Sequence, residues 1–415
     1  MSSLIFFLPA SVIAISWLRR NADPLSPGKL FLFVWSITLG TTELKLSALQ
    51  HTWSPIGWAV LSLGIGSFLA GTFVVYVIHL DAHLLSLDMI RKRVRDRQLD
   101  ERRAFKGIVL LFLCYAVSYL IIYQVKGFLP ISSLQDAMRR TEFQLFFFGI
   151  FLHMVVPILF FSVAYYFLVR ASAAHKTVVI IIAVMAFLSY ALLLSRYQLI
   201  MALVVSGVLL YYATTAIRWW KVLSVFGLAL FVSLAILTHR SGELVHLFLW
   251  KTSKMTVPAS LAFVTEPYMY VSMNLENFVR GVERIEYFTG GLLTSDFLLA
   301  LVGLKHALRS YFGIESLPYL ISGYNTYTSF WTYYRDFGLP GLVIIEFLLG
   351  SLAAILYYRL RLDPSIGRIT AYAFAVFVIM FSFFINILSN LWFVAIGVGT
   401  YILIRVSLNP ASVEQ

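Results

Sequence analysis

Long apolar runs recur along almost the whole chain, and no other feature restricts its fold as strongly. Each approaches the roughly 20 residues that a helix needs to cross the hydrocarbon core of a bilayer. With 60% hydrophobic and 13% charged residues, the composition excludes a soluble globular protein, whose charged fraction is about twice as high. We therefore predict an all-α polytopic integral membrane protein of about eleven transmembrane helices, near residues 3–18, 29–47, 55–79, 107–125, 144–169, 177–194, 197–216, 221–238, 338–358, 369–387 and 390–406.

Basic residues indicate the orientation, because cytoplasmic connections carry more Lys and Arg than outer ones. The chain is predicted to be N-out and C-in, and the same distribution explains the formal charge of +12 without nucleic acid as a partner. This orientation gives 19 Lys and Arg inside (19–29, 80–106, 170–176, 217–221, 359–368 and the C-terminal end) and 5 in the short outer connections (43–54, 126–143 and 195–196).

The first apolar run is expected to stay in the mature protein. It lacks the charged start and the small-residue cleavage site of a secretory signal, and Arg19 and Arg20 follow it. The predicted organisation is a membrane domain of about eight helices (1–238), a large extracytoplasmic loop (239–337), about three C-terminal membrane helices (338–406) and a cytoplasmic tail (407–415).

The loop 239–337 is the candidate functional domain. It carries eight basic and eight acidic side chains, and this balance favours specific polar contacts over general electrostatic steering. Its stretches Ala259–Leu275 and Phe297–Leu308 are apolar on part of their circumference but too interrupted to span. We expect them to be helices that lie on the outer interface.

The end of this loop joins a polar, aromatic segment directly to an apolar one at Gly338. Such a junction lies where membrane meets water, and it suits a ligand that is lipid at one end and sugar at the other. An aromatic belt at the interface is the alternative explanation for the rings. The candidate glycan-binding residues are Tyr324, Asn325, Thr328, Trp331, Tyr334 and Arg335.

Arginines on the outer side are candidates for binding phosphate. Arg196 lies in a connection so short that it must be near the membrane surface, where its two-pronged donors could hold a diphosphate. A snorkelling interfacial arginine is the alternative. Arg240 and Arg280, on the same predicted side, are further candidates for stabilising the diphosphate as a leaving group.

Three stretches resemble one family. YNTYTSFWTYYRDFGLPGLVIIEFLLG, at 324–350, resembles the C-terminal signature of the Wzy-type oligosaccharide repeat-unit polymerases, the O-antigen polymerase family. LLLSRYQLI around Arg196 and EPYMYVSMNLENFVRG at 266–281 are similar to two other parts of that family. The resemblance covers roughly residues 190–360, while the first half is similar only in being a row of spans.

The resemblance implies a membrane glycosyltransferase of GT-C-like architecture in the bacterial plasma (inner) membrane. Its substrates would be undecaprenyl-diphosphate-linked oligosaccharides, and the growing glycan would pass from one carrier to the next lipid-linked repeat unit at the outer face. A chain-length regulator and a flippase of the same pathway would be its partners, besides membrane lipid. The diphosphate is already a good leaving group, so no cofactor is expected.

A carboxylate or an imidazole is expected to accept the proton of the acceptor hydroxyl. Asp336, at the membrane junction beside Arg335, is the first candidate. Alternatively, it pairs with Arg335 or caps a helix that starts near Gly338. Glu276 and His239 are further catalytic candidates.

Two other features of the sequence have both a functional and a structural explanation. Glu346 lies inside a predicted span, where an ionisable group is costly unless it faces a cavity or a partner; it either approaches the diphosphate or makes an interhelical hydrogen bond. His79, Asp81 and His83 have an HxDxH spacing at the inner end of a span, where such residues usually just meet the interface, so no metal site is predicted.

Three other functions remain open from the sequence. An O-antigen ligase has a similar layout, although the D-F-G-x-x-G junction favours the polymerase. A transporter or flippase of lipid-linked oligosaccharides would show internal repeats and charges near the bilayer midplane, whereas here the polar residues gather in one loop. A non-catalytic scaffold is the third possibility.

Overall fold

The computed structural model describes residues 2–18, 23–96, 99–133, 136, 139–215, 246–315 and 317–408. Every regular element in these ranges is a helix, and their strand pairing is limited to two isolated bridges. The all-α prediction is therefore confirmed for the described chain. The predicted span 221–238, with His239 and Arg240, lies outside the described residues.

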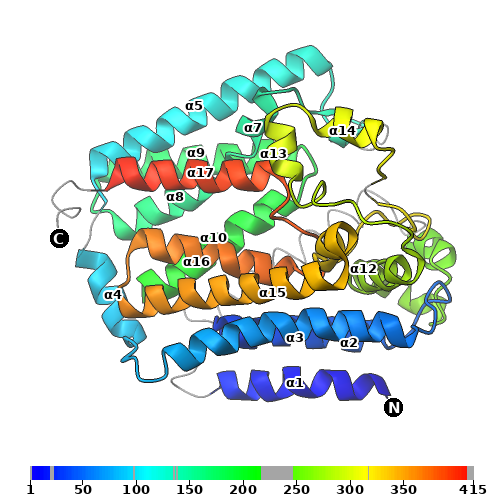
Figure 1. The fold of residues 1–415 in the computed structure, drawn as a ribbon. Coiled ribbons are helices and arrows are strands. Elements are labelled where there is room, and N and C mark those ends of the chain that lie inside the picture. Colours follow the sequence, from blue (N-terminus) through cyan, green and yellow to red (C-terminus); the bar gives the residue numbers. More distant parts are fainter. Residues whose placement is uncertain are drawn as a thin grey trace. The chain divides into compact units, whose positions relative to one another are not determined.

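The helices follow the predicted apolar windows closely. Their bounds are α1 Ser2–Trp17, α2 Pro27–Thr42, α3 Pro55–Ile78, α4 Leu87–Asp96, α5 Glu101–Lys126, η1 Arg140–Glu142, α7 Phe148–Leu152, α8 Val155–Leu168, α9 Ala173–Ala191, α10 Tyr197–Ala213, η2 Ala259–Val264, α12 Thr265–Arg284, α13 Asp296–Leu301, α14 Lys305–Tyr311, α15 Phe330–Leu362, α16 Ile366–Phe381 and α17 Leu391–Ser407 (Figure 1).

Five helical segments in the described chain are long and apolar enough to cross a membrane. This supports a helical membrane protein, while the full number of spans stays a prediction. The five are Pro55–Ile78, Glu101–Lys126, Phe148–Leu168, Ala173–Ala191 and Phe330–Leu362, and shorter apolar helices cover Ser3–Trp17, Tyr197–Ala213, Ile366–Phe381 and Leu391–Ser407.

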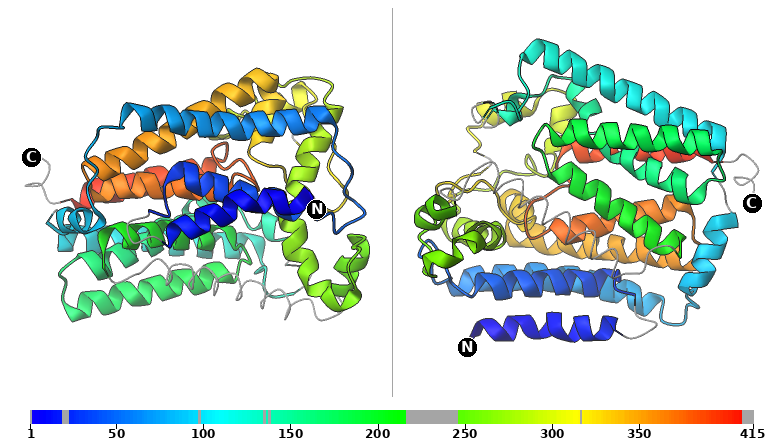
Figure 2. Two further views of the ribbon diagram at one scale, coloured as in Figure 1. Left: turned by 90° about the horizontal axis from the view of Figure 1, so that it is seen from below. Right: turned by 180° about the vertical axis from the view of Figure 1, so that it is seen from behind.

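The chain divides into two compact units. The first comprises Met1–Ala82, Leu234–Tyr358 and Val378–Leu391, and the second comprises His83–Ser233, Arg359–Phe377 and Trp392–Gln415. In the second unit, α8 packs against α5, α9 and α10, and α10 also contacts α4. In the first, α2 packs between α1 and α3, and α12 contacts both α2 and α3 across their ends (Figure 2).

Helix α12 bears on one prediction. The stretch Ala259–Leu275 was expected to lie on the membrane interface, and this stays a prediction: Leu261, Phe263 and Tyr270 are exposed, whereas the later part of α12 is mostly buried, including Asn274, Glu276 and Asn277. Its polar residues are covered because α2, α3 and the segment 321–331 surround it. By contrast, α13 and α14 and the turns that follow them expose apolar side chains such as Leu301 and Tyr311, as an interfacial position requires.

Helix α15 is kinked at the predicted junction. Gly338 has φ 66° and ψ −158°, a conformation that disfavours any side chain, and a Cβ there would lie 3.0 Å from Phe288 Cζ. Pro340 follows, at a position where its missing N–H costs little because a new helical segment begins. One helical segment starts at Phe330 and a second follows the kink at Gly338, so the polar half of the junction is itself partly helical.

Glycines bring α3 and α15 into backbone contact. A Cβ at Gly71 would lie 2.1 Å from the Phe347 carbonyl oxygen, and a Cβ at Gly350 would lie 2.1 Å from the Phe68 carbonyl oxygen. Small residues that let backbones approach in this way are typical of membrane helix pairs.

We expect Gly350→Ala to lower the melting temperature of the purified protein clearly, by the equivalent of about 3 kcal/mol, because the two helices must move apart. Gly66→Ala, on α3, is the matched control, since a Cβ there meets nothing within 4 Å. A melting temperature for Gly350→Ala equal to that of Gly66→Ala would refute the close contact.

Candidate functional site

The first unit holds a buried arginine that forms no ion pair with any described residue. The Arg335 side chain, on α15, is 0% exposed, and its Nη1 donates a hydrogen bond to the Tyr287 carbonyl oxygen at 2.5 Å. The guanidinium carbon lies 4.1 Å from the Tyr287 ring centroid and 5.9 Å from that of Trp331. Neither Nε nor Nη2 has an acceptor among the described residues. A buried charge in this state is costly until an anion pairs with it.

Two hydroxyl groups without a hydrogen-bond partner among the described residues precede this arginine by about two helical turns of sequence. The Tyr327 ring stacks on the Trp331 ring, with 4.4 Å between the centroids. The hydroxyl groups of Tyr327 and Thr328 are both buried without a hydrogen-bond partner in the described chain. Burial raises the pKa of the Tyr327 hydroxyl. The charge of Glu315 raises this pKa further, while the charge of Arg335 acts to lower it. We call Tyr287, Tyr327, Thr328, Trp331 and Arg335 the Arg335 centre.

Helix α12 fixes the segment that leads into the Arg335 centre. Gly281 gives Trp331 its space, because a Cβ there would lie 2.4 Å from Trp331 Cζ3. The Asn277 side chain donates to the Thr326 carbonyl and accepts from the Ile321 N–H, both at 2.9 Å. These hydrogen bonds tie residues 321–326 to a buried helix and so set the position at which α15 begins.

Asp336 holds the loop that carries Tyr287. Its Oδ1 accepts from the Thr289 hydroxyl and from Leu293 N–H at 3.1 Å, while its Oδ2 accepts from the N–H and the hydroxyl of Thr294, both at 2.6 Å. Both oxygens of this carboxylate are thus occupied by protein donors. The Arg335–Asp336 ion pair, which the sequence offered as an alternative, does not form, because the loop takes up the carboxylate.

A second polar cluster joins the connection 43–54 to α12. Glu276, which is fully buried, accepts from His51 N–H at 2.8 Å, from the Trp53 indole at 2.9 Å and from His51 Nδ1. The other His51 ring nitrogen lies 2.8 Å from Glu283 Oε2. Burial favours a higher pKa for Glu283, but hydrogen bonds from Ser54 and His51 outweigh it and lower that pKa.

This cluster, which we call the His51 bridge (His51, Glu276 and Glu283), is arranged as a structural tie. The two ring nitrogens face different carboxylates, so the three groups do not converge on one point. The described residues contain no group of three or more acids, histidines or cysteines suited to a metal ion. Glu276 holds residues 51–53 against α12 through these hydrogen bonds, and its catalytic role stays a prediction.

The other predicted residues have varied environments. Arg196 belongs to the second unit, half-buried at the start of α10, and Arg280 is half-buried on α12. Tyr324 shares a hydrogen bond of 2.8 Å with Ser253, and Asn325 is exposed. Tyr334 packs against Phe278 and Phe288 in the core. Glu346 is 2% exposed, and its Oε1 has no partner among the described residues.

Sequence reasoning missed His51 and Tyr287. His51 lies in a short outer connection and is 225 residues from Glu276, so no spacing could link the two. Tyr287 was not distinguished from the other rings of the loop. A systematic search for polar residues in the short outer connections would have included His51.

Comparison of the chain with protein-family models, with curated proteins and with solved structures finds no match.

Proposed function

We propose that this protein is a membrane glycosyltransferase that polymerises undecaprenyl-diphosphate-linked oligosaccharide repeat units at the outer face of the bacterial plasma membrane. The proposal includes about eleven spans, an N-out and C-in orientation and a GT-C-like architecture. One observation carries it: Arg335 is a fully buried cation at the start of a helix long enough to cross the membrane, and its Nε and Nη2 groups donate to none of the described residues.

The chemistry is a substitution at the anomeric carbon of the donor glycan. The acceptor hydroxyl oxygen forms the new bond, the bond to the diphosphate breaks, and the diphosphate leaves with the electron pair. The proton of the hydroxyl passes to an oxygen of the departing diphosphate. Preorganised cations stabilise the charge that develops on such a leaving group. We therefore assign Arg335 to the diphosphate rather than to sugar, with the Tyr327 and Thr328 hydroxyls as additional donors.

Access to Arg335 requires only a local movement. The Tyr287 ring, which covers the guanidinium, is itself 43% exposed, and rotation of this ring would uncover the cation. Asp336 then positions the loop rather than accepting the proton, because both of its oxygens already accept hydrogen bonds. Arg280, which belongs to the same unit, remains a candidate for the second cation, and Arg196 stays a predicted phosphate ligand.

The size profile of surface glycan tests the proposal. In a host from which this gene is deleted, we expect a polysaccharide gel to show single repeat units and no long ladder, with the ladder restored by the intact gene. Loss of the single-unit product as well would point to a ligase or a flippase, and an unchanged ladder would overturn the proposal.

A further inference from the structure

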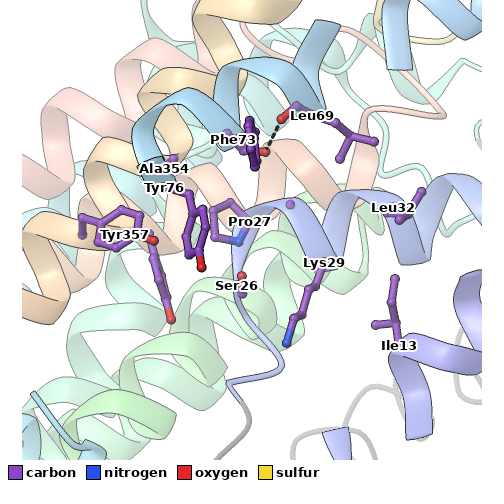
Figure 3. A pocket seen from close by; sticks show the side chains of 13 residues that line it. Ile13, Ser26, Pro27, Lys29, Leu32, Leu69, Phe73, Tyr76, Ala354 and Tyr357 are labelled. Carbon is purple, nitrogen blue, oxygen red and sulfur yellow. Dashed lines mark hydrogen bonds between the residues drawn. The ribbon is translucent and has the colours of Figure 1, made fainter. Parts of the chain in front are cut away.

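A cavity of about 400 Å³ lies in the first unit, away from the Arg335 centre (Figure 3). Its walls come from the C-terminal part of α1, the start of α2 and the last turns of α3 and of α15 as far as Tyr358. This volume is within the range of about 300–1,000 Å³ that is typical of small-molecule sites.

The cavity is polar at one end and apolar at the other. On α2, Ser26 and Lys29 precede Leu32, and on α3, Leu69 precedes Tyr76. On α15, Ala354 precedes Tyr357. Each helix thus places its polar lining residue nearer the helix end and its apolar residue about one or two turns deeper, and Figure 3 labels Ser26, Lys29 and Tyr76 among the side chains that line the cavity.

Among the described residues that line the cavity, Lys29 is the one with a formal charge, and none is Asp or Glu. This lysine is exposed and has no ion pair or hydrogen bond with any residue in the described ranges. Asp23, which follows α1, accepts instead from Leu25 N–H at 3.0 Å and from the Tyr357 hydroxyl at 3.1 Å. Within the described chain, the exposed ammonium group can therefore meet an external anion.

We propose that this cavity binds an anionic glycerophospholipid, with an acyl chain between Leu32, Leu69 and Ala354 and the phosphate at Lys29. Basic pockets between membrane helices on the cytoplasmic side commonly hold anionic headgroups. In the orientation that the basic residues favour, the start of α2 and the end of α3 lie on that side, near the basic segment 80–106. The inference depends on this orientation but not on the enzymatic activity.

Native mass spectrometry of delipidated protein in detergent, titrated with phosphatidylglycerol or phosphatidylethanolamine, tests the proposal. We expect tighter binding of phosphatidylglycerol, and about fivefold weaker binding of this lipid by Lys29→Gln, since one basic residue near a membrane surface contributes about 1 kcal/mol. Lys92→Gln, an exposed lysine on α4, is the matched control and should bind as the unchanged protein does. Ala354→Trp, which fills the apolar end, should weaken binding of both lipids.

Two results would overturn the proposal. One is undiminished phosphatidylglycerol binding by both Lys29→Gln and Ala354→Trp. The other is displacement of bound phosphatidylglycerol by equimolar polyprenyl phosphate, which would assign the cavity to the glycan carrier instead. The melting temperature of each variant shows whether it is folded, so a loss of binding that is caused by misfolding is recognised.

Discussion

Arg335→Gln is expected to reduce polymer formation by at least about a hundredfold, because loss of one preorganised donor to a developing anion typically costs 10²–10³ in rate. The neutral amide keeps hydrogen-bonding capacity but removes the charge that the diphosphate would meet. The measurement is the glycan ladder from a deletion host that carries the variant, with the amount of membrane protein matched by immunoblot.

Two further variants serve as comparisons for Arg335→Gln. Arg335→Lys keeps a point charge but not the planar fork, so we expect a shortened ladder rather than none. Arg284→Gln removes an exposed cation at the end of α12 and should leave the ladder intact. A full-length ladder from well-expressed Arg335→Gln would show that the buried cation has another role, even if the deletion host confirms the polymerase.

Asp336→Ala is expected to destabilise the protein by about 3–5 kcal/mol, because it leaves the buried donors of Thr289, Leu293 and Thr294 without their acceptor. Thermal unfolding of the purified protein in detergent, followed by tryptophan fluorescence, measures the effect as a lower melting temperature. Glu286→Ala, an exposed acid that precedes the same loop, should change the melting temperature little.

Asp336→Asn separates positioning from proton transfer. Its amide nitrogen cannot accept a hydrogen bond, so the loop must lose part of its attachment and the melting temperature should fall together with polymer formation. A variant that kept the melting temperature and lost the ladder would instead support the original prediction of Asp336 as the base.

Several helix boundaries were predictable because local residues define them. Ser54 accepts from Gly57 N–H ahead of Pro55, and Asp100 accepts from Arg103 N–H at the start of α5, as N-caps do. Gly127, with φ 70°, ends α5. The apolar window at 144–169 was less well predicted, since the chain there forms α7 and α8 with a break between them.

The candidate site was only partly predictable. The sequence predicts that Arg335 and Asp336 lie at a membrane junction. It led to the prediction of Asp336 as a catalytic residue and of Arg335 as a ligand of the sugar. Our proposal changes these two roles, because the loop 289–294 satisfies Asp336 while Nε and Nη2 of Arg335 meet no acceptor in the described chain.

The sequence by itself determined that this is a helical membrane protein. The length and polarity of each apolar run are local properties, and they decide whether a segment can cross a bilayer. Only the tertiary structure decided which polar side chains are satisfied. Glu276 meets His51 and Asp336 meets Thr294 across 225 and 42 residues, and the buried Arg335 has unused donors within the described chain. Hydrogen-bond satisfaction depends on such distant neighbours, and no local pattern encodes it.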